Sequence, residues 1–105
     1  TDPRALRVAA VVRADPATTT PLDQLARSAG AGKRTLERLF RAETGLTFGR
    51  WRQQARLLEA LRLIAAGRPV TTVALDVGYE SPSAFIAMFK TALGTTPSRY
   101  YSAGL

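Results

Sequence analysis

The sequence predicts an all-α fold of seven helices, arranged as two helix-turn-helix subdomains joined by one long connecting helix. Helix-start residues and glycine stops divide the chain into short helical segments. Two of those segments recur later in the chain at a nearly constant offset. No stretch sustains the apolar–polar alternation of a strand. The expected divisions are residues 1–46 for the first subdomain, 47–67 for the connecting helix and 68–105 for the second subdomain.

Capping and breaking residues set the first three helices. Asp2 and Pro3 are an N-cap and a first-turn proline, and they start a helix that runs to about Ala14. A second helix begins at Thr20-Pro21, where Asp23 would complete a capping-box-like pair with Thr20, and it ends at 30–32. A third starts near Lys33 and stops at Gly45. Residues at helical spacing are Leu6, Ala9, Ala10 and Arg13 in the first helix, Leu22, Leu25, Ala26 and Ala29 in the second, and Leu36, Leu39 and Phe40 in the third.

The same reasoning places the remaining four helices. Thr47 caps a helix over about 48–66, roughly 28 Å long at 1.5 Å per residue, which breaks at 67–69. A short helix over about 71–77 precedes a turn at 78–80. Ser81 and Pro82 start the next helix, which ends at Gly94, and 96–97 open a last short turn. The side chains expected to point inward are Phe48, Trp51, Ala55, Leu58, Leu61, Ile64 or Ala65, Phe85, Met88, Phe89, Ala92 and Tyr100.

Positive charge is concentrated in the first two thirds of the chain. The whole sequence carries 15 Lys and Arg against 8 Asp and Glu, a net charge of +7. Residues 1–69 hold 13 of those cations and 6 of the anions, whereas residues 70–105 hold two of each. A concentration of this kind is typical of a surface that binds a polyanion, although a solvated helix face would give the same composition. The densest cluster comprises Lys33, Arg34, Arg38, Arg41, Arg50, Arg52 and Arg56, interrupted by Glu37 and Glu43.

Missing residue types exclude several classes of function. The chain has no cysteine and no histidine, so disulfides, thiolate metal sites and histidine general bases are ruled out. No pair of carboxylates falls on one helix face for general acid/base chemistry. The apolar run at 8–12 is too short for a membrane span or a signal-peptide core. We therefore expect a basic cytoplasmic protein that is not an enzyme and uses no metal or cofactor.

An internal repeat is the most informative feature. The segment beginning Leu25-Ala26 aligns with Val73-Ala74 at an offset of 48, and after the turn the offset becomes 49. Each copy has a glycine four residues after a small alanine, followed by a longer helix with an apolar stripe. Two helices that meet near a right angle need a small residue at their crossing and a flexible residue at the corner. The repeat therefore predicts two helix-turn-helix units, whose second helices are the type that enters the DNA major groove.

With these residues in place, the sequence resembles the DNA-binding domain of the AraC/XylS family of bacterial transcription regulators. The residues that carry the resemblance in the second half are Ala74, Gly78, Tyr79, Ser81, Phe85, Phe89, Lys90, Gly94, Pro97 and Tyr100. The resemblance implies a monomer that binds double-stranded DNA, with its two recognition helices in adjacent major grooves. It implies a nucleoid-associated protein, with RNA polymerase as a further partner. Most members also carry a separate effector or dimerisation domain, although small single-domain members exist.

The resemblance also assigns roles to individual residues. In the first unit it places Arg34, Glu37 and Arg38 at base-reading positions, where arginine can pair with guanine and glutamate can accept from cytosine N4. In the second unit the outer positions are Ser83, Ala84, Ile86 and Ala87, which offer thymine-methyl contacts but few hydrogen bonds. The expected phosphate contacts are Lys33, Thr35, Arg41, Arg50, Ser81, Lys90 and Arg99.

Several alternatives remain open at this stage. Glu37 could pair with Arg34 or Arg41 on a wet surface, Ile86 could pack on a neighbouring helix, and the arginines of the connecting helix could simply be solvated. Two departures from the family pattern are Gly32, where serine usually caps the reading helix, and Tyr101, where a basic residue is usual. A nonspecific architectural nucleic-acid-binding protein and a helical protein-interaction module, such as a polymerase-binding adaptor, are the rival functions.

Overall fold

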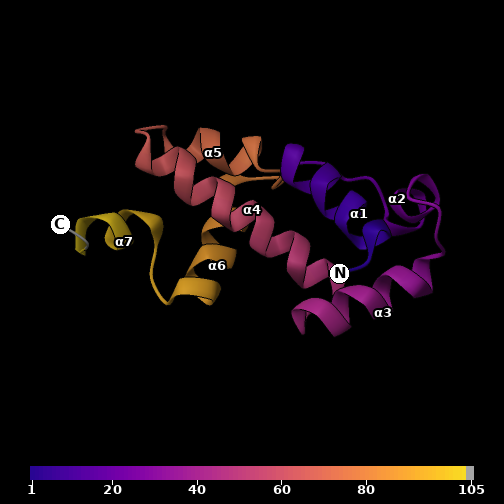
Figure 1. Ribbon diagram of the computed structural model, residues 1–105. Helices are drawn as coiled ribbons and strands as arrows, with labels where there is room; N and C mark the ends of the chain where they lie inside the picture. Colours follow the sequence, from indigo (N-terminus) through magenta and orange to yellow (C-terminus); the bar gives the residue numbers. More distant parts are fainter. Residues whose placement is uncertain (104–105) are drawn as a thin grey trace. The chain divides into compact units, whose positions relative to one another are not determined.

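The computed structural model describes residues 1–103, and all of its regular structure in that range is α-helical, with no strand (Figure 1). The class predicted from the sequence is therefore confirmed. The chain forms seven helices over those residues: α1 (Pro3–Ala14), α2 (Leu22–Ser28), α3 (Lys33–Thr44), α4 (Phe48–Ala65), α5 (Val70–Asp76), α6 (Pro82–Leu93) and α7 (Pro97–Ala103). None of the helices in this part of the chain is long and apolar enough to cross a membrane.

The chain divides into two compact units within α4. The first unit comprises Thr1–Arg56, and the second begins at Leu57. The start of α4 therefore belongs to the first unit and its end to the second. Each unit has a hydrophobic core of its own.

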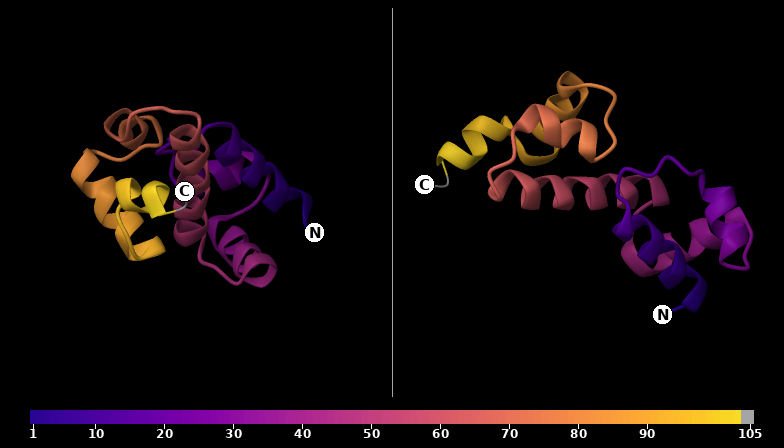
Figure 2. Two further views of the ribbon diagram at one scale, coloured as in Figure 1. Left: turned by 90° about the vertical axis from the view of Figure 1, so that its left-hand side faces the viewer. Right: turned by 90° about the horizontal axis from the view of Figure 1, so that it is seen from above.

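Helices α1, α2 and α3 pack against one another around the first core (Figures 1 and 2). Leu36 is completely buried, and Phe40 contacts Phe48 and Trp51 of α4 with ring centroids 5.1 Å away in both cases. The other side chains buried in this core are Ala5, Val8, Ala9, Val12, Leu22, Leu25, Ala26 and Ala29. The core thus fixes α3 by its inner face and leaves the opposite face to solvent.

The second core has the same plan on a smaller scale. Phe85 and Phe89 of α6 are fully buried, as are Val73 and Ala74 of α5 and Ala60 of α4. Helices α5 and α6 pack together, and α7 packs on α6. Two buried side chains one turn apart therefore fix each helix to its core: Phe85 and Phe89 in α6, and Leu36 and Phe40 in α3.

The internal repeat extends to the hydrogen bonds at the two turns. In the first, the Ala31 amide donates to Ala26 O over 2.9 Å, and in the second the Tyr79 amide donates to Ala74 O over 3.0 Å. Gly30 and Gly78 occupy the intervening corner with φ of 80° and 101°. Only glycine adopts this left-handed conformation without a steric cost, so the glycine spacing in the sequence has a backbone reason.

The equivalence continues beyond α3 and α6. The Thr47 hydroxyl accepts from the Arg50 amide over 3.2 Å, and the equivalent Thr96 hydroxyl accepts from the Arg99 amide over 3.3 Å. The ring of Phe40 meets Trp51 at 5.1 Å, and the equivalent rings of Phe89 and Tyr100 meet at 5.6 Å. The duplication is therefore one of packing and capping as well as of sequence.

The structure corrects one expectation in the first half and shows which face of α1 is buried. Thr20 does not cap α2, because the N-cap is Pro21 and its carbonyl receives the first helical amides; the Thr20 hydroxyl is bonded to Thr18 instead. The helical spacing noted in α1 confirms the helix, but of its four residues only Ala9 is buried. Leu6 is 51% exposed, and Ala10 and Arg13 are exposed as well. The buried row of α1 is Ala5, Val8, Ala9 and Val12.

Further corrections concern the inward side chains of the second half. Leu58 is 67% exposed, because the buried position on that turn of α4 is Ala60. Of the two alternatives at the end of α4, Ile64 packs on the second core and Ala65 is exposed. Ala92 is exposed and the neighbouring Leu93 packs on the core in its place. Tyr100 packs edge-to-face with Phe89, with ring centroids 5.6 Å apart, but is 40% exposed. The predicted helix boundaries hold to within one residue at α1, α3, α4, α5 and α6.

Candidate nucleic-acid interface

Helix α3 presents one polar face outward because its other face is buried. Leu36 and Phe40 point into the first core, and Gly45 ends the helix with φ of 74°. The N-cap is Gly32, which supplies no side-chain hydrogen bond, so the first amides of α3 have no capping side chain. At 100° per residue, the side chains directly opposite this core are Arg34, Arg38 and Arg41, which we call the outer face of α3.

All three arginines of the outer face are exposed. Among the residues that the structure describes, none of the three forms a hydrogen bond or an ion pair through its side chain. They border a shallow hollow together with Glu37 and Ala42. Guanidinium groups without intramolecular partners keep their five donors available for an external acceptor.

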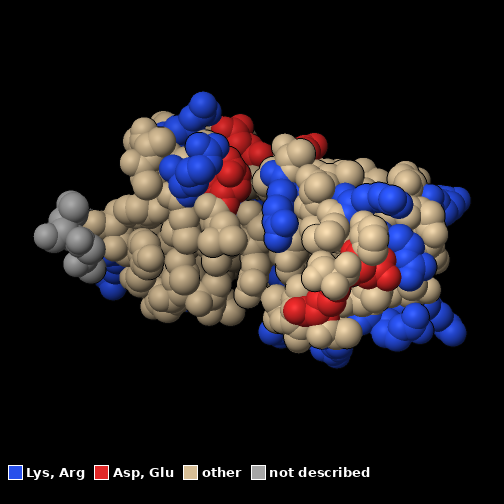
Figure 3. Space-filling model, viewed as in Figure 1, with Lys and Arg blue, Asp and Glu red and all other residues tan. Residues whose placement is uncertain are grey.

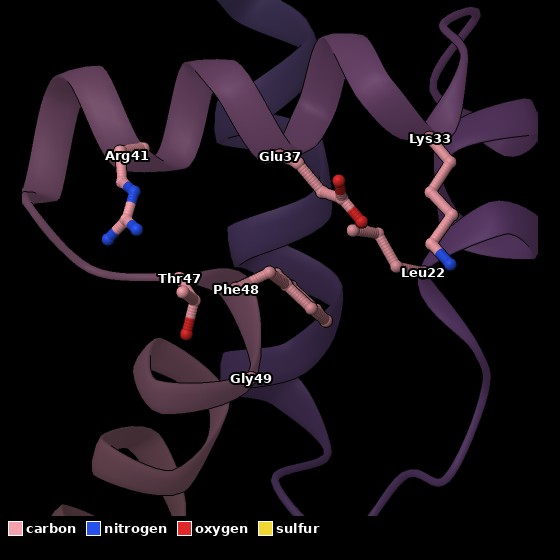
Figure 4. A pocket seen from close by; sticks show the side chains of 7 residues that line it. All are labelled: Leu22, Lys33, Glu37, Arg41, Thr47, Phe48 and Gly49. Atoms are coloured by element: carbon pink, nitrogen blue, oxygen red, sulfur yellow. The ribbon is translucent and has the colours of Figure 1, made fainter.

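Glu37 lies on the flank of the outer face, in one row with Lys33 and Arg41. This row lines a groove of about 490 Å³ between α3 and the start of α4 (Figure 4). Figure 4 shows the side chains of the row extending from α3 toward Thr47, Phe48 of α4 and Leu22 of α2. Within residues 1–103, Glu37 forms no ion pair with Arg34 or Arg41. The alternative in which it neutralises a neighbouring arginine is therefore absent from this structure.

The residues on the side of this groove opposite α3 were not predicted from the sequence as part of a site. Thr47 was expected only as a cap and Phe48 only as an inward side chain of the connecting helix, yet with Gly49 they line the groove opposite Lys33 and Arg41. The short link after Gly45 is the signal that could have indicated this, because it leaves α4 no room to begin far from α3. The groove walls carry two cations, one carboxylate and a phenyl ring.

The three arginines at the start of α4 have different surroundings. Arg50 is exposed, as its assignment to phosphate requires. Arg52 and Arg56 are half-buried, and their guanidinium groups donate to carbonyls of the connection between α1 and α2. Partial burial and the adjacent Arg56 charge lower the pKa of Arg52. Simple solvation, the alternative left open for the arginines of the connecting helix, therefore does not describe Arg52 and Arg56.

Helix α6 begins with a capping side chain that α3 lacks. The Ser81 hydroxyl accepts from the Ala84 amide over 3.1 Å, and Pro82 occupies the first turn. Ser83, Ala84, Ala87 and Lys90 are exposed, whereas Ile86 is half-buried against the second core. The packing alternative for Ile86 is thus realised for part of its side chain. In Figure 3 the surface over α6 is largely uncharged, while cations border α3.

The remaining expected phosphate contacts are differently placed. Thr35 is half-buried on the flank of α3, and Arg99 is exposed at the start of α7. Tyr101, which stands where a basic residue is usual, donates its hydroxyl to Leu61 O over 2.8 Å, and burial raises its pKa. Tyr101 therefore ties α7 to α4 inside the second unit.

Comparison with known proteins agrees with this architecture. A family model described as a helix-turn-helix domain matches residues 25–103, which include both repeats. A solved AraC-type DNA-binding-domain protein from Chromobacterium violaceum superposes with a TM-score of 0.85 over 92% of this chain and 88% of that one, at 22% identity. The chain belongs to the AraC family of helix-turn-helix transcription regulators.

Two further relatives fit this AraC-family domain. The HTH-type transcriptional regulator NimR of Escherichia coli (strain K12) is 48% identical over 79 residues, which are 75% of this chain and 29% of NimR. The chain thus spans under a third of that relative. The DNA-binding domain of the global transcriptional factor AdpA, solved in complex with a target DNA, is 33% identical with a TM-score of 0.84, over 98% of this chain and 93% of that one.

Proposed function

We propose that α3 enters the DNA major groove and reads bases through Arg34, Arg38 and Glu37. The observation that carries this proposal is the outer face of α3: three exposed arginines with no hydrogen-bond or ion-pair partner among residues 1–103, on a helix fixed from behind by Leu36 and Phe40. Bidentate pairing with guanine O6 and N7 requires available guanidinium donors on a helix whose position is fixed by the core. Glu37, which forms no ion pair within the described part of the chain, can accept from cytosine N4.

Phosphate contacts would position α3 on the duplex. The candidates are Lys33, Arg41 and Arg50, with Thr35 on the flank. Lys33 and Arg41 border the groove whose far wall is the start of α4, where helix amides and the helix dipole also favour an anion. Such contacts carry no sequence information themselves but account for most of the salt dependence of binding.

The second unit would bind the adjacent major groove through α6 in the same manner. Its support is the duplication, which gives α6 the same buried face and the same preceding turn as α3. Ser83, Ala84 and Ala87, with the exposed part of Ile86, are suited to thymine methyl groups. Ser81, Lys90 and Arg99 are the phosphate candidates. With only these cations, the second unit would contribute less to affinity and to sequence information than the first.

In the cell, we propose a cytoplasmic, nucleoid-associated regulator that is not an enzyme. RNA polymerase and a separate effector or dimerisation domain would be its further partners. The family membership supports these roles, as does the length of NimR, of which this chain spans 29%.

Selection of bound duplexes from a random pool tests the proposal. We expect enrichment of a site with two informative blocks about 10 base pairs apart, the spacing of successive major grooves on one face. The block read by α3 should be the more informative and contain guanines. Binding without any enrichment would support the nonspecific architectural function instead, and absence of binding even at low salt would support a protein-interaction module.

A further inference from the structure

Two arginines of α4 bind the backbone of the connection between α1 and α2, residues 15–21. Arg56 donates from Nε to Pro16 O over 2.9 Å and from Nη2 to Thr18 O over 3.1 Å. Arg52 donates from Nη2 to Thr20 O over 2.7 Å. The two side chains therefore hold alternate carbonyls along the connection, at sequence separations of 32 to 40 residues.

The held carbonyls lie directly before α2. Thr20 precedes Pro21, whose carbonyl accepts the first two helical amides of α2, from Gln24 and Leu25, over 3.1 Å each. Helix α2 in turn packs on α3. A change in the path of the 15–21 connection would therefore shift the start of α2 and, through that contact, the helix that reads DNA.

The surroundings of Arg52 favour a positioning role over a phosphate contact. Its guanidinium lies 4.8 Å from the centroid of the Phe48 ring, and its Nε is buried without a hydrogen-bond partner in the described part of the chain. Burying a cation beside a second cation, Arg56, is unfavourable unless the guanidinium gains hydrogen bonds. A solvent-facing phosphate contact would need none of this burial, as the exposed Arg50 on the same helix illustrates.

We propose that Arg52 and Arg56 are positioning residues for DNA recognition, which fix the 15–21 connection and thereby α2 and α3, and that they do not bind phosphate. The inference rests on the proposed function of α3. It divides the cationic cluster of 33–56 into residues that release counterions from DNA and two that determine specificity indirectly.

The test compares Arg56→Lys, Arg56→Gln and Arg52→Gln with Arg50→Gln in the 105-residue chain. Arg56→Lys is the decisive variant, because it keeps the charge but cannot reproduce the two-carbonyl geometry of a guanidinium. Affinities are measured over a salt series for the duplex selected from the random pool and for a shuffled duplex of the same composition. Amide hydrogen exchange at Thr18 and Thr20 reports the connection itself, since these amides donate to Asp15 O and to the Thr18 hydroxyl.

We expect all three Arg52 and Arg56 variants to lose about tenfold in preference for the selected duplex, equivalent to about 1.4 kcal/mol. Their salt slope should stay at the wild-type value while exchange at Thr18 and Thr20 accelerates. Arg50→Gln should instead reduce the slope by about one unit and leave exchange unchanged.

Two outcomes would overturn the inference. One is a reduced slope in Arg56→Gln that Arg56→Lys restores, which would make Arg56 a phosphate contact. The other is accelerated exchange with preference unchanged, which would make the connection irrelevant to recognition. If the wild-type chain itself shows no preference between the two duplexes, the proposed function fails first, and the exchange data still show whether the arginines hold the connection.

Discussion

Replacing Arg38 by alanine separates base reading from folding. The side chain is exposed and has no hydrogen bond or ion pair among the described residues, and alanine is the best helix former for the interior of α3. The free energy of unfolding should therefore change by no more than about 0.5 kcal/mol. Loss of a bidentate contact to guanine should cost about 1–3 kcal/mol of binding free energy, roughly 5- to 150-fold in affinity for the selected duplex.

The assay is a fluorescence anisotropy titration at fixed salt with the selected and the shuffled duplex, accompanied by thermal unfolding. Arg27→Ala is the matched control, since Arg27 is an exposed arginine of α2 outside the candidate interface and its loss removes the same charge. The control should weaken both duplexes slightly and equally. Equal losses on the two duplexes for Arg38→Ala, or losses no larger than those of Arg27→Ala, would refute its role in base reading.

Three other predictions concern the scaffold. Leu36→Ala, which empties a fully buried site on the inner face of α3, should lower the free energy of unfolding by about 2–5 kcal/mol in denaturant titrations, and an effect below 1 kcal/mol would contradict the packing. Gly30→Ala should cost about 1–2 kcal/mol because the corner requires a φ of 80°, while its Cβ would meet no atom within 4 Å; an unchanged melting temperature would count against the left-handed corner. Hydrogen bonds from the Arg4 side chain and amide lower the pKa of Asp2 from 3.8 to about 2, so its carboxylate stabilises the fold above pH 3.8 and this contribution disappears as the pH falls toward 2. Wild type should therefore lose stability relative to Asp2→Asn over that acid range, and parallel unfolding curves would show that the carboxylate is not held.

Local chemistry made most of the helices predictable from the sequence. Asp2 and Ser81 accept hydrogen bonds from amides two and three residues ahead, and Gly45 and Gly94 end their helices in the left-handed conformation. Such signals depend on neighbours within a few residues, so they can be recognised without the fold. The repeat was also predictable, because both copies need a small alanine and, four residues later, a glycine at the turn between their helices.

The features that could not be predicted from the sequence depend on contacts between distant segments. The buried face of α1 could not be chosen by spacing alone, since Leu6 and Val8 each begin a plausible helical row, and packing on α2 and α3 selects Val8. Ile86 is divided between solvent and the second core for the same kind of reason. The carbonyl partners of Arg52 and Arg56 lie more than 30 residues away, and a carbonyl has no signature in the sequence.

Methylation interference on the selected duplex tests the central claim most directly, because guanine N7 lies in the major groove and adenine N3 in the minor groove. Two helix-turn-helix units that read successive grooves should give interfering guanine N7 methyl groups in the block read by α3, and weaker binding when uracil replaces thymine in the block about 10 base pairs away. Arg38→Ala should abolish interference in the α3 block only. Interference confined to adenine N3, or guanine N7 interference that persists unchanged in Arg38→Ala, would contradict it.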